Sequence, residues 1–161
     1  MTQKQLHEMF EYKNGQLIYK IKTSRKVKIG DVAGYVNKLG YRQISINYKL
    51  YQAHRLIWIM HNGDIETGLD IDHIDRNPSN NRIENLRVST RSQNRSNSTK
   101  QKNNTSGYKG VSWHKCAKKW MACIKHNQIH IHLGLFATPE LAHAAYVDAA
   151  TKLHKDFAFL D

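Results

Sequence analysis

Residues 70–97 read D-I-D-H-I-D-R-N-P-S-N-N-R-I-E-N-L-R-V-S-T-R-S-Q-N-R-S-N, and this stretch decides the expected fold. Apolar residues alternate with acids over residues 69–72, which is the pattern of a half-buried strand. A turn-forming cluster follows at residues 77–80, and a second short strand is predicted at residues 86–88. Thr90 has a glutamine three residues later, the spacing of a capping box at a helix start. The predicted order is strand, loop, strand, helix.

Four side chains of this stretch suit phosphodiester hydrolysis: Asp72, His73, Asn85 and Asn94. The reaction needs an activated water and stabilisation of charge on phosphorus and on the leaving oxygen, and a divalent cation can supply the stabilisation. Carboxylate and amide oxygens are hard ligands, which favour Mg²⁺, with Mn²⁺ as an alternative, over zinc. We expect Asp72 and Asn94 as ligands and His73 as general base. The alternative is that these residues only form turns and caps in a polar loop.

The pattern D-H-I-D-x-N-P-x-N-N-R-x-E-N-L-R, followed by an asparagine-bearing helix, resembles the HNH nuclease motif of the ββα-metal fold. The resemblance covers most of residues 51–98 and is closest to phage-type homing endonucleases. It implies that Asp72 is the metal-binding acid, that His73 is the general base, and that Asn85 braces the loop holding the histidine. Asn94 stands where many HNH enzymes have histidine, which gives an H-N-N triad and favours Mg²⁺ over a tight zinc site.

Short β-type runs separated by glycine turns predict an antiparallel meander before this motif, within an N-terminal region 1–62. Tyr48 is expected on the buried side of the last run. Residues 51–62 predict the central core helix, with Gly63 as its C-cap. His54, at the edge of that helix, fits a packed histidine better than a functional one. The predicted runs are 16–19, 32–36 and 41–46.

The chain after the motif changes character. We expect an HNH nuclease region at 63–98, a polar and basic linker at 99–106, and a domain at 107–161. In that domain Thr138 and the proline after it open an alanine-rich helix, and three strands precede it, at residues 108–113, 120–125 and 128–133. The expected class is therefore α+β: a β meander with a helix, a ββα-metal core, and a three-stranded antiparallel sheet packed on one helix.

The segments S-G-Y-K-G-V-S-W and W-M-A-C-I-K, with the helix that follows them, are similar to the DNA-binding domain of plant ethylene-response factors, the Apetala family. The resemblance covers nearly all of residues 107–161 and implies that the exposed sheet face reads DNA. Apolar rows, including Trp113 and Ile129, are expected to pack on the helix. The opposite face holds Ser112, His114, Lys125, His130 and His132, so the family's target sequence does not carry over. His130 and His132 offer an alternative as metal ligands.

The charge of the chain points to a polyanion partner. The 161 residues include 25 Lys and Arg against 13 Asp and Glu, a formal net charge of +12. Residues 76–119 hold eleven of these cations and a single acid, Glu84. Neutralised phosphates release counterions, so we expect this segment to track double-stranded DNA, although a solvated basic face is the alternative. The expected phosphate contacts are Arg82, Arg87, Arg91, Arg95, Lys100, Lys102 and Lys109.

Cys116 and Cys123 form no C-x-x-C pair, and two thiols without a secretory signal fit a reducing cytoplasm, that of the host if the gene is phage-encoded. No run approaches the ~18 apolar residues that span a bilayer, so no membrane partner is expected. The sequence thus predicts an HNH endonuclease that cuts one or both strands of duplex DNA, with a monomer favoured. A non-catalytic DNA-binding regulator with a decayed nuclease unit and an RNA-processing protein are the rivals; no RRM or KH signature supports the latter.

Overall fold

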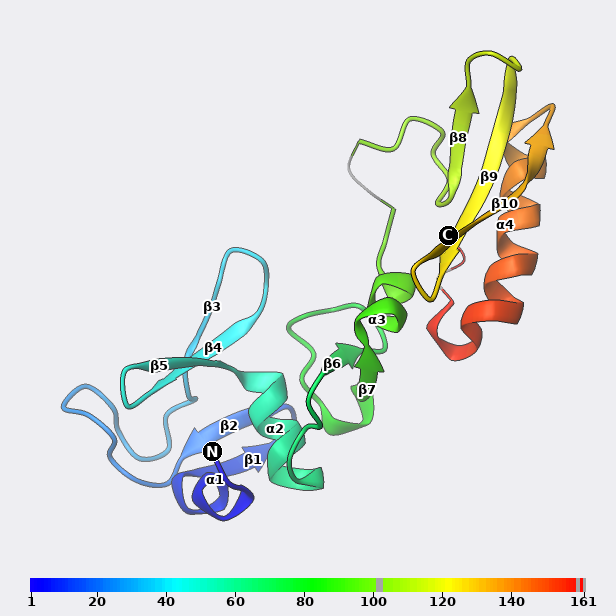
Figure 1. The fold of residues 1–161 in the computed structure, drawn as a ribbon. Coiled ribbons are helices and arrows are strands. Elements are labelled where there is room, and N and C mark those ends of the chain that lie inside the picture. Colours follow the sequence, from blue (N-terminus) through cyan, green and yellow to red (C-terminus); the bar gives the residue numbers. More distant parts are fainter. Residues whose placement is uncertain (101–102, 159, 161) are drawn as a thin grey trace. The chain divides into compact units, whose positions relative to one another are not determined.

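The computed structural model of the protein describes residues 1–100, 103–158 and 160. The chain forms two compact units, residues 1–90 and 91–161 (Figure 1). Small antiparallel sheets and four α-helices make up the described part, which confirms the expected α+β class. Within that part, every helix is too short or too polar to cross a membrane.

The first unit contains two helices and three small antiparallel sheets, in which β1 pairs with β2, β4 lies between β3 and β5, and β6 pairs with β7. A single turn of 3₁₀ helix at Ile83–Asn85 leads into β7. The elements run α1 (Gln3–Met9), β1 (Phe10–Lys13), β2 (Gln16–Tyr19), β3 (Tyr35–Val36), β4 (Arg42–Ile46), β5 (Lys49–Gln52), α2 (Ala53–Asn62), β6 (Leu69–His73) and β7 (Leu86–Thr90).

The helix α1 was not expected in a region predicted as β meander. Thr2 and Gln5 form a capping box, in which the Gln5 N–H donates to Thr2 Oγ1 at 3.3 Å and the Thr2 N–H donates to Gln5 Oε1 at 2.9 Å. Leu6 on this helix is fully buried. The T-x-x-Q spacing at residues 2–5 is therefore the sequence signal that the meander prediction passed over.

The meander is otherwise partly as expected. The β1–β2 hairpin turns at Asn14-Gly15, whose φ angles of 49° and 83° suit a two-residue turn. The prediction for Tyr48 is wrong: it has φ 61° in the turn between β4 and β5 and is fully exposed, because β4 ends two residues earlier. The predicted run 32–36 is reduced to β3 and one bridge from Val32 to Ile18.

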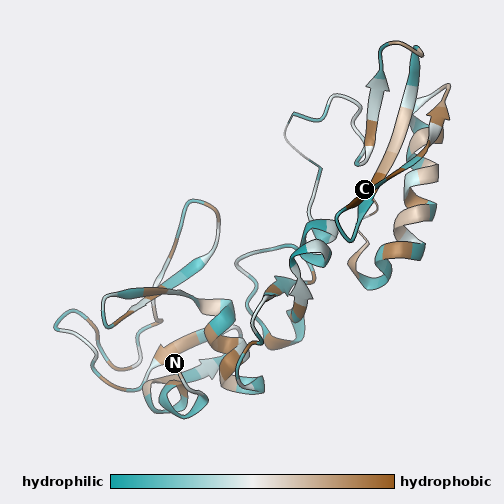
Figure 2. Ribbon diagram, in the orientation of Figure 1, coloured by the Kyte–Doolittle hydropathy of each residue, from teal (hydrophilic) through white to brown (hydrophobic). Residues whose placement is uncertain are grey.

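The core of the first unit forms around α2, which begins two residues later than predicted because residues 49–52 extend the sheet as β5. Leu56 and Ile57 are almost fully buried and pack in one cluster with residues of β1, β2, β4, β6 and β7. Figure 2 shows the hydrophobic stretches of β2 and α2 next to one another. Gly63 ends α2 as expected, with φ 83° and its N–H donating to Ile59 O at 3.0 Å. The core thus fixes the base of the β6–β7 hairpin.

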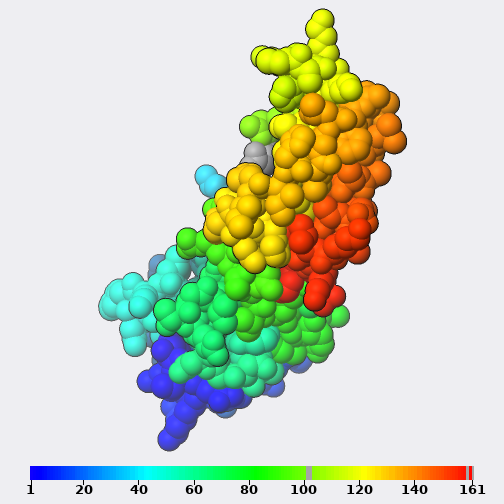
Figure 3. Space-filling model, turned by 45° about the vertical axis from the view of Figure 1, so that its right-hand side comes forward, coloured from blue at the N-terminus to red at the C-terminus, as the bar shows by residue number. Residues whose placement is uncertain are grey.

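The second unit contains a three-stranded antiparallel sheet, with β9 in the centre, packed on the long helix α4. Figure 3 shows β10 and α4 side by side, in orange to red. Thr138 caps α4 as predicted, since its Oγ1 accepts the Leu141 N–H at 3.3 Å, and Pro139 opens the first turn. The elements run α3 (Arg91–Asn97), β8 (Val111–His114), β9 (Lys119–His126), β10 (Ile129–Phe136), α4 (Pro139–His154) and a 3₁₀ turn (Lys155–Phe157).

The apolar rows of the sheet face α4 only in part. Ala122 and Ile124 of β9 are buried and belong to the two clusters beneath α4, as expected. Ile129 and Trp113, expected in the same rows, are 66% and 45% exposed. Ile129 pairs with His126 beside the hairpin turn, and the ring of Trp113 packs edge to face on that of Trp120. Ile129 is the first residue of β10 and Trp113 the last but one of β8, and near strand ends parity alone does not guarantee cover from the helix.

Candidate functional site

The end of β6 carries the acid and the histidine of the predicted site. In the β6–β7 hairpin Asp72 pairs with Arg87, and His73 pairs with Leu86. Both predicted side chains are almost fully buried, with 6% and 5% of their surface exposed. The Arg76 N–H donates to His73 O at 3.0 Å, which turns the chain out of the strand directly after the histidine. The two groups are therefore held by a strand that is itself anchored on the core.

The ring of His73 is oriented by a residue that the sequence analysis did not single out. His73 Nε2 lies 2.9 Å from Oδ1 of Asn81, and Asn81 is 3% exposed. An amide oxygen only accepts hydrogen bonds, so Nε2 is the protonated nitrogen in this contact. A neutral imidazole carries one N–H, and the basic nitrogen of His73 is then Nδ1.

The carboxylate of Asp72 is paired with the guanidinium of Arg87 across the hairpin. Arg87 Nε and Nη2 lie 3.0 and 2.9 Å from the same oxygen, Oδ2. Burial strengthens such a pair because water screens it less. Arg87 was expected to contact phosphate. The pairing places Arg87 next to the proposed ligand instead, and its contact with DNA stays a prediction.

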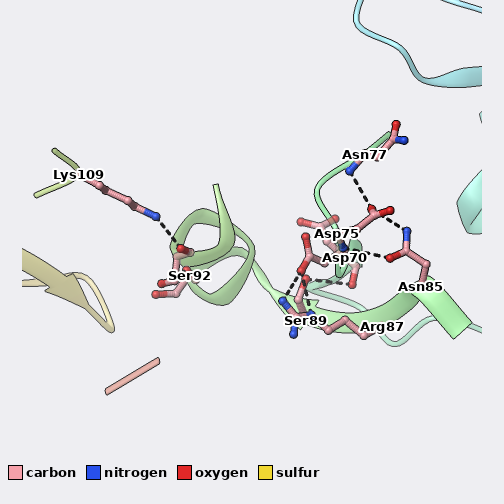
Figure 4. Close-up of polar contacts among 10 residues, drawn as sticks. Asp70, Asp75, Asn77, Asn85, Arg87, Ser89, Ser92 and Lys109 are labelled. Carbon is pink, nitrogen blue, oxygen red and sulfur yellow. Dashed lines mark hydrogen bonds and ion pairs between the residues drawn. The ribbon is translucent and has the colours of Figure 1, made fainter. Parts of the chain in front are cut away.

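Asn85 braces the loop between the two strands. Its Oδ1 accepts the Asp75 N–H at 3.0 Å, and its Nδ2 donates to Asp75 Oδ1 and to Asn80 O, both at 2.8 Å. Asn80 Nδ2 and the Asn77 N–H also donate to the Asp75 carboxylate, at 2.6 and 2.8 Å, and Figure 4 shows the backbone nitrogen of Asn77 and the side chain of Asn85 directed at it. Partial burial acts to raise the pKa of Asp75, but these hydrogen bonds hold it below its usual value. The loop after His73 is thus closed around an ionised carboxylate.

His54 of α2 lies against the ring of His73. The two ring centroids are 4.9 Å apart at 70°, and Tyr41 lies 5.8 Å from His54 and 6.1 Å from His73. Burial, with smaller contributions from the nearby His73 and Arg55, lowers the pKa of His54 to about 3. His54 is therefore a packed, neutral histidine, as expected. Its ring also contacts His73, the predicted base.

Asn94, the second predicted ligand, is a half-buried residue of α3 in the second unit. Its partnership with Asp72 stays a prediction from the sequence. The donor chemistry fits a hard cation, since one carboxylate and one amide oxygen leave room for the waters that Mg²⁺ retains. Over residues 1–100, 103–158 and 160, no three His, Cys, Asp or Glu side chains are grouped to hold a metal ion, so an all-protein cage of these residues does not form there. That also applies to His130 and His132.

A polar groove of about 750 Å³ in the second unit collects several predicted DNA contacts. Among its described lining residues are four cations and no carboxylate. Lys125 and Arg95 are exposed, whereas Lys100 Nζ donates to Gly107 O at 2.7 Å. Lys109 Nζ donates to Ser96 O and Ser98 O, both at 2.6 Å, and so caps the end of α3. The predicted contacts in this groove are Arg95, Lys100, Lys109, Ser112 and Lys125.

The remaining predicted contacts lie elsewhere on the two units. Arg82 is exposed in the loop of the first unit, and Arg91 is exposed at the start of α3. His130 and His132 are exposed along β10 and pair with Lys125 and Cys123 of β9. His114 is half-buried, and its Nδ1 accepts the Ala117 N–H at 3.1 Å. Lys102 lies outside the described residues.

The sequence analysis did not single out Asn81 or Asp75, and it took His54 as a packed histidine without a link to His73. The segment 77–85 contains four asparagines, and composition does not tell which of them turns inward. The one sequence feature related to Asn81 is Gly15 of the first hairpin, which packs against the backbone of residues 81–82. A Cβ at Gly15 would lie 2.9 Å from Arg82 N and 3.1 Å from Asn81 C. That close approach needs the folded backbone, so the sequence could not supply it.

Comparison with protein families divides the chain in the same way as its motifs. Residues 51–96 match the family model described as HNH endonuclease, and residues 106–155 match the AP2 domain. One segment of the chain is thus similar to HNH endonucleases and the next to AP2 domains, and we call these residues the HNH segment and the AP2 domain. This confirms both resemblances in the predicted order. The HNH segment contains His54, Asp72, His73, Asn81 and Asn85, whereas the AP2 domain contains β8, β9, β10 and α4.

Two individual proteins resemble the chain. Protein 3.8 of Escherichia phage T7 is 42% identical over 77 residues, which are 48% of this chain and 64% of the phage protein. The solved structure of the HNH homing endonuclease I-HmuI, described for its DNA binding and cleavage, is 23% identical, and the match covers 88% of this chain and 82% of that one, with a TM-score of 0.44. The assignment of the two segments rests on the family models.

Proposed function

We propose that the protein is a metal-dependent HNH endonuclease that hydrolyses phosphodiester bonds of duplex DNA. The observation that carries the proposal is the orientation of His73, which directly follows buried Asp72 in β6 and whose Nε2–H is held by buried Asn81. An imidazole fixed in one tautomer, next to an acid at the end of an anchored strand, is what activation of a water requires. The HNH and AP2 assignments support the substrate class.

The proton path follows from that contact. Nδ1 of His73 takes a proton from the attacking water, and the imidazolium that forms keeps Nε2–H on Asn81 Oδ1. The positive ring is then stabilised by an acceptor that was already in place, so little reorganisation accompanies proton transfer. Asn85 contributes by holding the loop that carries Asn81, through its bonds to Asp75 and Asn80.

Asp72 and Asn94 would hold the divalent cation, for which we propose Mg²⁺, with Mn²⁺ as a substitute. When bound, the cation supplies stabilisation of charge on phosphorus and on the leaving 3′ oxygen. Arg87 orients the Asp72 carboxylate through the contacts of Nη2 and Nε with Oδ2 at 2.9 and 3.0 Å.

The AP2 domain would supply DNA affinity and sequence preference. The basic groove of the second unit would present Arg95, Lys100 and Lys125 to phosphates, and the exposed row on β10, His130 and His132, would present hydrogen-bonding groups to base edges. We assign three regions, 1–62, 63–98 and 107–161, with the linker 99–106 between the second and the third. We further propose a monomer that nicks DNA, acting in the cytoplasm of the host, in line with the similarity to a phage protein.

The test is incubation of the purified chain with supercoiled plasmid, with and without Mg²⁺. We expect relaxed or linear DNA only with the cation, and sequencing of the product ends should map a preferred site and show whether one strand or two are cut. Binding without cleavage under every divalent cation would favour the rival, a regulator with a decayed nuclease unit. Preference for RNA in a competition assay would overturn the choice of substrate.

A further inference from the structure

The ring cluster beside the predicted base contains a histidine that the nuclease mechanism does not use. We propose that His54 is a positioning residue that holds the ring of His73 in the orientation needed for its bond to Asn81. The inference rests on the proposed function, because it concerns the base of that reaction. His54 lies on α2, in the HNH segment, and reaches His73 of β6 from the core helix of the unit.

The geometry of the contact fixes the plane of the His73 ring. The two imidazoles meet edge to face, with centroids 4.9 Å apart and planes at 70°, and Tyr41 packs at 53° to His54 and 58° to His73. Edge-to-face pairs restrict rotation because the attractive arrangement is lost when either ring turns. With its centroid held on one side and Nε2 held by Asn81 at 2.9 Å, the ring of His73 has little freedom about χ2.

The anchor side of the contact is rigid. His54 is 7% exposed, and its helix neighbours Ala53, Leu56 and Ile57 are 1% exposed or less in the core of the unit. Burial lowers the pKa of His54 to about 3, with smaller contributions from His73 and Arg55, so the ring is neutral in neutral solution. A neutral ring packs on His73 without repelling the imidazolium that forms during proton transfer.

A misplaced base costs rate and leaves binding intact. Catalytic groups must be held close to the productive geometry, and an error of about 1 Å reduces the rate on the order of 100-fold. DNA affinity comes from residues elsewhere, so loss of the His54 contact should appear in kcat and spare Kd. This separates a positioning role from a general loss of folded protein.

The experiment compares His54→Leu and His54→Phe in the full chain. Leucine fills similar space without a ring, whereas phenylalanine restores an aromatic edge and face. We expect His54→Leu to lower kcat for Mg²⁺-dependent plasmid nicking tenfold or more with Kd for duplex DNA within about twofold, and His54→Phe to recover most of the rate. The control is His61→Leu on the same helix, whose ring packs on Tyr12 at 4.5 Å and which should keep wild-type kcat.

Heteronuclear NMR of the His73 ring supplies a readout that does not need activity. We expect the Nε2–H tautomer to dominate in the wild type and in His54→Phe, and a mixture of tautomers with a broadened ring signal in folded His54→Leu. An unchanged His73 signal in His54→Leu, together with unchanged kcat, overturns the inference. A wild-type chain that never cuts DNA overturns the proposed function instead, and the NMR comparison then still decides whether His54 orients His73.

Discussion

The loop between β6 and β7 and the sheet face of the AP2 domain are both rich in polar side chains, but they use them in opposite ways. In the loop, His73, Asn85 and Asp75 bond to partners within the same hairpin. On the sheet face, Lys125, His130 and His132 are exposed along two neighbouring strands. The first region is organised before any ligand arrives, whereas the second presents its donors outward.

The difference reflects what each region has to do. Chemistry needs groups fixed in place before the reaction, and the loop achieves this with short hydrogen bonds among its own residues. Recognition needs groups that can form new hydrogen bonds with a partner. A polar row exposed to water gives up fewer bonds within the protein when it binds. Substitutions in the loop should therefore act on rate and stability, and substitutions on the sheet should act on binding.

The largest effect is expected for the base itself. His73→Ala removes the group that takes the proton from water, so plasmid cleavage should fall about 10²–10⁴-fold. Affinity for duplex DNA, measured by fluorescence anisotropy, should change by less than about threefold, because Lys and Arg side chains supply it. His132→Ala is the matched control from the sheet face and should keep the cleavage rate at saturating DNA. Equal loss of rate in both variants would remove the contrast between the regions.

The next effect concerns the brace of the loop. Asn85→Ala deletes three hydrogen bonds, two of them to Asp75, so the free energy of unfolding should fall by about 1–3 kcal/mol. Asn62→Ala removes an exposed asparagine at the end of α2, whose only described bond is 3.4 Å long, and should cost less than about 0.5 kcal/mol. Urea unfolding monitored by circular dichroism measures both. Equal stabilities would show that water replaces the Asn85 bonds at no cost.

The sequence predicted the regions in which local pattern decides the structure. Alternation identified β6 and the start of β7, and Thr138-Pro139 identified the start of α4, because these signals depend on neighbours in the chain. At the site, a motif with fixed spacing was available: His73 lies at the end of β6 and Asn85 bonds to the loop, whereas the catalytic roles of both stay predictions.

Long-range contacts decided the features that the sequence did not predict. The role of Asn81 depends on a hydrogen bond across the loop, and that of His54 depends on the approach of α2 to β6. Arg87 shows the same limit: a basic residue in a basic segment looked like a phosphate contact, but strand pairing places it opposite Asp72. Register and packing, which no window of sequence contains, set these three pairings.

The acid stability of the first unit should report the buried His54. Its pKa is about 3 in the folded chain against an ordinary value of 6.5, so below pH 6.5 the unfolded chain binds a proton that the folded chain does not. The contribution of His54 to the free energy of unfolding is therefore at its full value above pH 6.5. On acidification toward pH 5 the free energy of unfolding should fall by about 1 kcal/mol per pH unit. His54→Phe should flatten this part of the curve. His154 of the second unit, whose pKa is also lowered by burial, keeps a smaller slope of the same sign in both proteins.

The smallest effect is expected from single cations on the recognition side. Lys125 is exposed and lines the basic groove, so Lys125→Ala should reduce the slope of log binding constant against log salt concentration by about one, with unchanged stability. Lys109→Ala should also make the slope shallower. In addition it should destabilise the second unit, because Lys109 Nζ caps Ser96 O and Ser98 O at 2.6 Å. Salt titrations by anisotropy and thermal unfolding together separate the two lysines. A salt slope unchanged by Lys109→Ala would show that Lys109 does not contact phosphate and acts only as a helix cap. Within the recognition region, Lys109 would then stabilise the fold, whereas Lys125 would bind DNA.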